Sequence, residues 1–566
     1  MFKTSLSALL VSTVLVVIPF QTLQAEGLAG AYLAGRSASI DFDFNTAANY
    51  YTRALVQDPS NPALMEATIL SHVGAGAVDR ALPIARRLHD LNSGDQVSNL
   101  VLLSDAVARE DYAAAFKMLD NGDTVGPLVD GLVLAWVQFG EGRMSEALGS
   151  FDEVSKAPGL QNFGLYHKAL ALAVAGDLEG ADEILSGRSG VTLPATRRGV
   201  LAHVEILSQL ERNDAAIELI DTVFSGNLDP GLETIRSRLA AGETLPFRTV
   251  ASARDGVAEV FFSIAGALMG EAEDAYTLLY TRMAEYLKPD HVDAILLSAQ
   301  LLERLGRYEL ANAEYNLIPA DDPAFHAAEL GRADAMRRSG DTEGAINVLG
   351  KLSQSHPDQP GVHIALGDLL RSEERYAEAT AAYDAAIVLI KEPDPAQWPI
   401  YFARGITYER TDKWPKAEAD FRKALELSPD QPQVLNYLGY SFVEMKQNLD
   451  EALDMIERAV AGRPDDGYIT DSLGWVLYRL GRYGEAVDVM ERATELTPVD
   501  PIVNDHLGDV FWAVGRHREA EFQWHRALSF EPEDKDATRI RRKLEVGLDV
   551  VLEEEGGDPI TKSNDG

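Results

Sequence analysis

Three histidines lie close together near the C-terminus, at His506, His517 and His525. Imidazoles at such spacing bind zinc when a third or fourth ligand, and hydrogen-bonded partners of those ligands, complete the site. The local sequence supplies no such ligand motif, so surface or helix-packing roles are favoured for these side chains. We therefore predict no metal site and no cofactor.

No signature of a known enzyme class accompanies these histidines. The sequence contains neither a glycine-rich phosphate loop ending in lysine nor a Gly-x-Ser-x-Gly elbow. With 89 Asp and Glu among 566 residues, pairs of acids are expected by chance, and no glycosidase motif supports one. The chain has no cysteine, which excludes disulfides and thiol catalysis. These observations favour a protein that is not an enzyme.

The charge of the chain limits its partners. The formal net charge of −38 repels nucleic-acid backbones and anionic membrane surfaces. Such a charge keeps a long exposed surface soluble, and it also attracts basic partners. We favour the first interpretation and keep the second open, and we predict no nucleic acid among the partners.

The elements that position these residues follow from a repeat of about 34 residues. Gly405, Gly439, Gly474 and Gly508 are spaced 34, 35 and 34 apart, and each begins the same internal order. That order continues through alanine, a bulky residue, a second alanine and a closing proline: Ala417, Ala452, Ala486 and Ala520; Phe421, Ile456, Met490 and Trp524; Ala424, Ala459, Ala493 and Ala527; Pro429, Pro464, Pro498 and Pro532. A fixed period of this length indicates one supersecondary unit stacked on copies of itself.

The order of small and large residues predicts a hairpin of two helices. Small residues allow two helices to approach closely, and large ones fill the space beside them. Gly306 and Gly481 stand where the first helix must end, because glycine adopts the left-handed cap without strain. The closing proline cannot continue the second helix.

This pattern resembles the tetratricopeptide repeat, and the match holds over several consecutive copies. The alanine in the middle of the repeat recurs at fourteen positions: Ala47, Ala81, Ala115, Ala147, Ala181, Ala216, Ala275, Ala311, Ala345, Ala379 and the four above. The resemblance implies an all-α fold, a right-handed superhelical solenoid of about fourteen helical hairpins. Such a chain has no single core and grows by adding neighbours.

The pattern also suggests how the chain is divided. We predict a signal peptide at 1–25, an N-terminal array at 26–220, an irregular insertion at 221–262, a C-terminal array at 263–532, a capping helix at 533–555 and a disordered tail at 556–566. The insertion breaks the period and contains Pro230, Gly242 and Pro246. It is either a joint between two arrays or a functional excursion on one face.

The resemblance also implies where a partner would bind, because first helices line the concave face in this family. The lining positions here are Asp368, Arg371, Asn436, Tyr440, Asp471, Trp475, Tyr478, Arg479, Asp505, Asp509 and Trp512. Aromatic rings among acids suit an extended or helical peptide with cationic groups. We expect Trp475→Ala with Tyr478→Ala to weaken partner capture while leaving helicity intact. The alternative is that Trp475 and Trp512 pack between neighbouring first helices.

One variety of the family holds a chain terminus with a clamp of lysine, asparagine and arginine. The equivalent positions here are acids or an aromatic residue, Asp471, Trp475, Asp505 and Asp509. An acidic C-terminal tail is therefore not the expected ligand.

The N-terminal sequence predicts an export signal. One lysine precedes an apolar run from Leu6 to Ile18, Pro19 breaks the run, and Ala25 offers a cleavage site. The run is short for a spanning helix, which favours cleavage and a periplasmic protein over an N-terminal anchor in the inner membrane. Because the chain has no cysteine, the lipid anchor of bacterial lipoproteins is not expected.

Residues 31–64, and residues 471–487 with 504–528, resemble exported proteobacterial tetratricopeptide proteins, some of which are lipoprotein adaptors of carboxyl-terminal processing proteases. That resemblance implies a non-enzymatic scaffold for protein or peptide partners, including a protease. Two alternatives remain open. One is a component of secretion, pilus or polysaccharide assembly, and the other is an envelope enzyme with its site in 221–262. The oligomeric state is not determined by the sequence.

Overall fold

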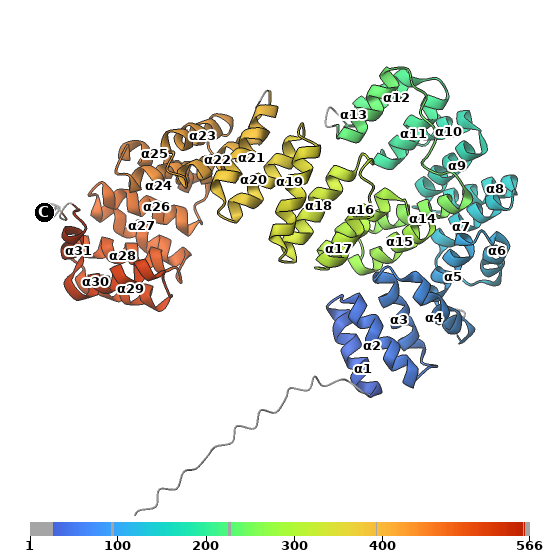
Figure 1. Ribbon diagram of the computed structural model, residues 1–566, viewed down its shortest axis with the longest axis horizontal. Helices are drawn as coiled ribbons and strands as arrows, with labels where there is room; N and C mark the ends of the chain where they lie inside the picture. Colours follow the sequence, from blue (N-terminus) through green and yellow to red (C-terminus); the bar gives the residue numbers. More distant parts are fainter. Residues whose placement is uncertain (1–26, 92–94, 225–227, 392, 558–559, 561–566) are drawn as a thin grey trace, which may run out of the picture. The chain divides into compact units, whose positions relative to one another are not determined.

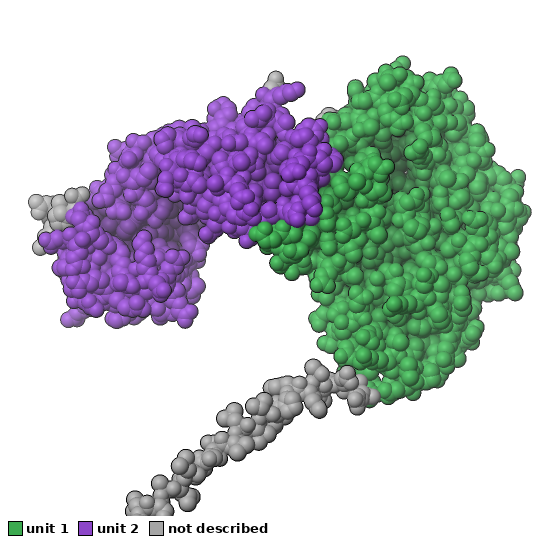
Figure 2. Space-filling view, in the orientation of Figure 1, with its two compact units in different colours: residues 1–345 green, residues 346–566 purple. Residues whose placement is uncertain are grey.

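The computed structural model describes residues 27–91, 95–224, 228–391, 393–557 and 560. Within this part of the chain every regular element is a helix (Figure 1). The chain forms two compact units, unit 1 at residues 1–345 and unit 2 at residues 346–566 (Figure 2). The predicted signal peptide and most of the predicted tail lie outside the described residues. None of the described helices is long and apolar enough to cross a bilayer.

Unit 1 begins with six helical hairpins and one single helix. They are α1 (Leu28–Ile40), α2 (Phe44–Gln57), α3 (Pro62–Gly74), α4 (Val78–Leu91), α5 (Gln96–Ala108), α6 (Tyr112–Asn121), α7 (Pro127–Gly140), α8 (Met144–Lys156), α9 (Gln161–Ala175), α10 (Leu178–Leu185), α11 (Arg197–Gln209), α12 (Asn213–Phe224) and α13 (Pro230–Ala240).

The array then resumes through the end of unit 1. The helices are α14 (Ala253–Leu268), α15 (Asp274–Leu287), α16 (Val292–Arg304), α17 (Tyr308–Tyr315), α18 (Phe325–Arg338) and α19 (Thr342–Ser355), and the boundary between the units falls inside α19.

Unit 2 continues with five regular hairpins and two short terminal helices. They are α20 (Pro360–Ser372), α21 (Tyr376–Leu389), the 3-10 helix η1 (Pro395–Gln397), α22 (Trp398–Glu409), α23 (Trp414–Leu427), α24 (Pro432–Glu444), α25 (Leu449–Gly462), α26 (Gly467–Arg479), α27 (Tyr483–Leu496), α28 (Pro501–Ala513), α29 (His517–Ser529), α30 (Asp534–Val546) and α31 (Leu548–Glu554).

The repeat pattern correctly predicts the helical hairpins. Consecutive helices pair from α1–α2 to α28–α29, with α13 as the unpaired helix between the sixth and seventh pairs. Thirteen of the fourteen predicted mid-repeat alanines have no exposed surface. The exception is Ala275, which is half-buried, while Thr277 two residues later is fully buried. The irregular spacing before this hairpin therefore shifted the predicted position by two residues.

The close approach of the paired helices depends on glycine opposite a large side chain. A Cβ atom on Gly405 would lie 2.5 Å from the Phe421 ring, and one on Gly439 would lie 2.8 Å from the Ile456 side chain. Gly306 and Gly481 end their first helices with φ angles of 70° and 74°, as the predicted caps require. Large residues thus fill the space that the missing side chains leave.

The seventh hairpin gives unit 1 an architecture that the repeat alone does not imply. Helix α14 packs against α5, α7 and α9, and α15 packs against α3 and α5, so this hairpin covers the first helices of the second to fifth hairpins. Figure 1 shows α14 and α15 lying along α5, α7 and α9. Gly256 lets α14 approach so closely that a Cβ atom there would overlap the Trp136 ring.

Two predicted segments are more ordered than the sequence suggested. The 221–262 segment contains the end of α12, all of α13 and the first turns of α14, and its described non-helical residues are 228–229 and 241–252. Pro230 stands in the first turn of α13, where a backbone N–H would have no partner within the helix, so proline is tolerated there. The predicted capping helix at 533–555 is two helices, because Gly547, with φ of 85°, separates α30 from α31.

Candidate functional site

The first helices of unit 2 form a common surface, which we call the inner face. Helices α20 and α22, α24 and α26, and α26 and α28 contact one another directly, while each second helix packs against its own first helix. All eleven residues predicted to line a groove lie on these first helices: Asp368 and Arg371 on α20, Asn436 and Tyr440 on α24, Asp471, Trp475, Tyr478 and Arg479 on α26, and Asp505, Asp509 and Trp512 on α28.

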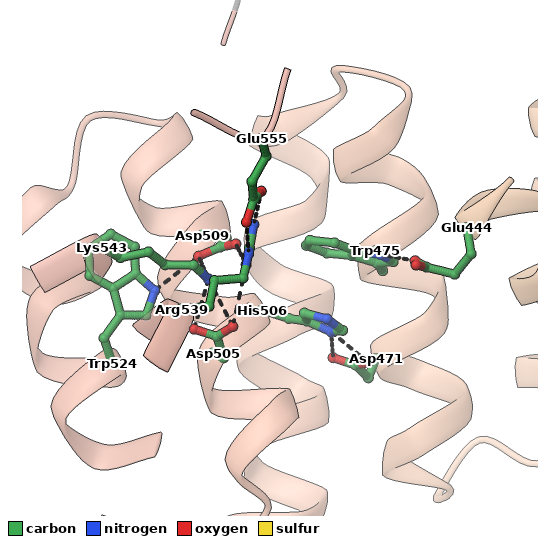
Figure 3. A network of polar contacts seen from close by, with 10 residues as sticks. All are labelled: Glu444, Asp471, Trp475, Asp505, His506, Asp509, Trp524, Arg539, Lys543 and Glu555. Atoms are coloured by element: carbon green, nitrogen blue, oxygen red, sulfur yellow. Dashed lines mark hydrogen bonds and ion pairs between the residues drawn. The ribbon is translucent and has the colours of Figure 1, made fainter. Parts of the chain in front are cut away.

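A stack of aromatic rings connects α24, α26 and α28. The Trp475 ring stacks on His506, with 4.0 Å between centroids, and on Tyr478, with 4.8 Å. Trp475 Nε1 donates a hydrogen bond of 3.0 Å to Glu444 Oε1 (Figure 3). Only 6% of the Trp475 surface is exposed. This ring therefore packs between neighbouring first helices, which was the alternative interpretation for Trp475.

The acids of α28 are held by cations from the C-terminal helix α30. Lys543 Nζ lies 2.8 Å from Asp505 Oδ2 and 2.6 Å from Asp509 Oδ1, and Lys543 is 1% exposed. Asp509 also accepts a hydrogen bond of 3.0 Å from Trp524 Nε1, and Arg539 lies 3.5 Å from its other oxygen. Figure 3 shows these groups converging from α28, α29 and α30. The acids of the last repeat are thus neutralised within the chain.

A buried histidine completes this network. His506 Nδ1 lies 3.0 Å from Asp471 Oδ2, and both groups are buried. Burial alone would lower the pKa of His506, but the charge and hydrogen bond of Asp471 outweigh burial and raise it. For Asp505, burial raises the pKa, and the positive charge of Lys543 opposes this shift. The site is therefore a set of compensated charges inside unit 2.

These contacts correct part of the predicted groove. Asp471, Trp475, Tyr478, Asp505 and Asp509 are buried and do not offer an open surface to a partner. The physical reason differs along the groove: Lys543 of α30 pairs with Asp505 and Asp509, whereas His506 of the neighbouring first helix α28 contacts Asp471 and Trp475.

The sequence pattern did not indicate Glu444, Arg539 and Lys543, whereas His506 has the helix-packing role that the sequence favoured. The basic run Arg539–Lys543 following the last repeat was the available signal, since buried acids require a nearby cation.

Another part of the predicted groove remains accessible. The Asp368 side chain is 52% exposed and the Arg371 side chain 35% exposed, with 3.8 Å between their charged atoms. Tyr383 donates a hydrogen bond of 2.7 Å to Asp368 Oδ1, which fixes that carboxylate. Asn436, Tyr440, Arg479 and Trp512 are partly buried. We call these six residues the open part of the inner face.

The histidines do not gather into a metal site. His517 stacks on Trp512 with 4.1 Å between centroids, and His525 is exposed on α29. Among the described residues, no group of three or more His, Cys, Asp or Glu side chains is arranged to hold a metal ion.

Comparison with known families assigns the repeat. The sequence matches the tetratricopeptide repeat family over residues 330–397, 398–431, 446–501 and 472–531. This chain carries tetratricopeptide repeats. The matched segments lie between α18 and α29, and α24 falls between two of them. The first seven hairpins, including the one that covers the inner side of unit 1, lie outside the matched segments.

Curated relatives share the repeat over part of their length. The chain is 26% identical over 165 residues to the TPR repeat-containing protein PA4667 of Pseudomonas aeruginosa, covering 29% of this chain and 27% of the relative. It is 26% identical over 181 residues to tetratricopeptide repeat protein 13 of Homo sapiens, covering 31% and 20%. The alignments thus span about a quarter or less of these relatives.

Solved structures with likeness to this chain are also tetratricopeptide or related helical assemblies. The APC/C hetero-tetramer Cut9–Hcn1 aligns with 93% of this chain and 97% of its own at 15% identity, with a TM-score of 0.36. YrrB, a TPR protein with an unusual peptide-binding site, aligns with 34% of this chain and 97% of its own at 22% identity, with a TM-score of 0.28.

Proposed function

We propose that the chain is a periplasmic scaffold that binds protein or peptide partners on the open part of the inner face of unit 2. The observation that carries this proposal is the set of exposed or partly buried polar and aromatic side chains on the first helices α20, α24 and α26, from Asp368 to Arg479. A tetratricopeptide array supplies extended contact area, and extended area suits a protein partner better than a small substrate.

The finer proposal is that one partner is a processing protease, for which the chain acts as an adaptor. Its support is the resemblance of residues 31–64, and of 471–487 with 504–528, to exported adaptor proteins. Affinity purification of the tagged full-length chain from periplasm, followed by mass spectrometry, tests it. Recovery of a processing protease is expected. Recovery of only secretion, pilus or polysaccharide assembly proteins would support the scaffold and overturn the adaptor role.

The enzyme alternative places a catalytic site in the 221–262 segment, and we prefer the scaffold to it. Glu259, its most deeply buried charged residue, accepts hydrogen bonds from Arg198 and Tyr166 at 2.6 and 2.9 Å. Paired charges of this kind are typical of a structural network, since a catalytic carboxylate must reach its substrate. Hydrolytic activity in the purified chain, with no stable partner, would reverse this preference.

The structure calls for a different variant from the one the sequence suggested. Trp475→Ala with Tyr478→Ala removes buried rings, so we now expect it to destabilise unit 2 as well as to affect partner capture. The charge reversals Asp368→Lys and Arg371→Glu alter accessible groups instead. We expect the combined reversal to reduce recovery of the partner severalfold, with Glu457→Lys on the second helix α25 as the matched control. Equal recovery with both variants would place the contact elsewhere.

Export has its own test. Fractionation should recover the chain in the periplasm, and N-terminal sequencing should begin at Glu26. Recovery in the inner membrane with an intact N-terminus would instead support the anchored alternative.

A further inference from the structure

Unit 1 contains a cavity of about 1060 Å³, separate from the inner face of unit 2. Helices α9, α11 and α12 line one side and α14 and α16 the other, while the connection between α10 and α11, residues 186–196, adds part of the rim. Ligand pockets commonly have volumes of roughly 300–1000 Å³, so the space is sufficient for a small organic molecule.

The cavity exists because the seventh hairpin folds back onto earlier ones. Helix α14 packs on α7 and α9, but α11 and α12 do not pack closely on α14 or α16. Arg198 spans the gap, with ion pairs of 2.6 Å to Glu259 on α14 and 2.6 Å to Asp293 on α16. The gap is therefore bridged by the ion pairs of a partly buried arginine.

Its walls are mostly apolar and follow helical spacing. The residues concerned are Ala215, Leu219 and Thr222 on α12; Phe262, Ser263, Gly266 and Ala267 on α14; and Leu296, Leu297 and Gln300 on α16. A Cβ atom added to Gly266 would meet no atom within 4 Å. Small residues thus face an unfilled apolar space, where the close packing usual between helices is absent.

One end of the cavity combines a helix N-terminus with three arginines, each paired with a carboxylate. Thr196, Arg197, Arg198 and Gly199, at the N-terminus of α11, all line it, and a helix N-terminus attracts anions. The Arg188 and Arg197 side chains are 54% and 45% exposed. Three lining carboxylates, Asp182, Glu259 and Asp293, are each paired with an arginine, and Glu218 is exposed on α12. Arg197 itself pairs with Asp229 at 2.5 Å through one nitrogen.

We propose that this cavity binds a single-chain amphiphile, with its hydrocarbon chain between α12, α14 and α16 and its anionic head at the N-terminus of α11. A free fatty acid and a lysophospholipid share this chemistry. An apolar space of this kind gains free energy from each methylene group removed from water, and the charged end orients the chain.

The first experiment uses the full-length chain and fatty acids of eight, ten and twelve carbons, with binding measured by titration calorimetry and native mass spectrometry. Affinity should rise roughly fourfold for each added CH₂ if the chain is buried. Gly266→Leu should fill the cavity and weaken dodecanoate binding by about tenfold or more. Gly149→Leu on α8 is the control, because its Cβ atom also meets open space and it lies outside the lining.

Both substitutions replace a helical glycine with a better helix former, so both variants should fold. Their thermal unfolding midpoints confirm this before binding is compared. Absence of dodecanoate binding to the unsubstituted chain, or equal binding to the Gly266→Leu and Gly149→Leu variants, would overturn the proposal.

A second variant tests the position of the head group. Arg197→Gln should weaken dodecanoate by roughly threefold to tenfold and leave dodecanol unchanged, because only the acid carries the charge. An equal effect on both ligands would contradict the placement of the head.

Phospholipid vesicles separate the sources of the ligand. Transfer of lysophospholipid from anionic vesicles to the chain, lost in Gly266→Leu, supports a lipid source, whereas binding of the free acid alone supports a soluble one. Binding of an amphipathic helical peptide in place of either amphiphile would overturn the assignment.

Discussion

The two units build on the same helical hairpin but treat its inner side differently. In unit 1 the seventh hairpin, α14–α15, packs across the first helices of four earlier hairpins. In unit 2 the first helices keep an accessible part, and only the last hairpin is covered, by α30. The comparison teaches that a repeat fixes how neighbours stack but not what lies against the inner side of the stack.

Buried charges show the same contrast. In unit 1 a buried charge also reaches a distant hairpin: Arg282 on α15 pairs with Glu314 on the neighbouring α17 and contacts the carbonyl of Gly74 on α3, 208 positions away. In unit 2 the pairs join neighbouring hairpins, as His506 does with Asp471, or the last hairpin and its cap. Unit 1 is thus closed by long-range contacts, whereas unit 2 is a succession of local ones.

The largest expected effect on the stability of unit 2 comes from removing the ammonium group of Lys543 on α30. Lys543→Ala would leave Asp505 and Asp509 buried without their main partner, which typically costs about 3–5 kcal/mol. Urea unfolding followed by circular dichroism and by protection of α28–α30 from hydrogen exchange should show the loss in unit 2. Arg542→Ala, an exposed neighbour paired with Glu554, is the control and should leave unfolding unchanged. A small effect of Lys543→Ala would mean that the cap is dispensable.

Buried histidines sharpen the comparison through opposite pKa shifts. Burial lowers the pKa of His167 in unit 1 to about 4, and Trp136 Nε1 donates to its Nδ1. Below pH 6.5 the unfolded chain protonates His167, whereas the folded chain keeps it neutral. The free energy of unfolding should therefore fall by about 3 kcal/mol as pH drops from 6.5 toward 4.

His506 in unit 2 should behave oppositely. Its pKa is raised, so the stability that it contributes is complete below pH 6.5 and lost as pH rises through the folded value. Histidine-selective NMR at pH 6.5 should find His506 mostly charged and His167 neutral, with His167→Gln and His506→Gln assigning the signals. The same charge state at both histidines would contradict the predicted opposite pKa shifts.

A smaller effect tests whether α14 closes unit 1. Gly256→Ala places a methyl group against the Trp136 ring, and overpacking of this kind costs about 1–3 kcal/mol. Thermal unfolding and limited proteolysis within residues 241–252 should both respond. Gly149→Ala on the exposed side of α8 should instead leave stability unchanged or raise it slightly. Equal behaviour of the two variants would argue against tight packing of α14 on α7.

The smallest effect is expected on the open part of the inner face. Asp368→Lys changes an accessible carboxylate, so the free energy of unfolding should change by no more than about 0.5 kcal/mol. Chemical unfolding of the variant beside the unsubstituted chain measures this. A loss of several kcal/mol would show that Asp368 holds unit 2 together and that partner binding needs another explanation.

Most of the fold could be predicted because each hairpin is specified by contacts within about 34 residues. Gly405 against Phe421 and Gly439 against Ile456 are separated by 16 and 17 positions, so their spacing repeats visibly in the sequence. The site could be predicted only in part. The positions on first helices follow from the repeat, but whether Asp368 stays accessible and Asp509 does not depends on where α30 packs.

The sequence by itself determined the helical hairpins, their number and the helices that carry the candidate residues, because small and large side chains alternate at a fixed period. Tertiary structure alone decided three features: the closure of unit 1 by α14–α15, the cavity that Arg198 spans, and the burial of Asp505 and Asp509 by Lys543. These rest on contacts between residues 34 to more than 200 positions apart, such as Arg282 with Gly74. No local period records such contacts, since they arise only when the finished hairpins pack against one another.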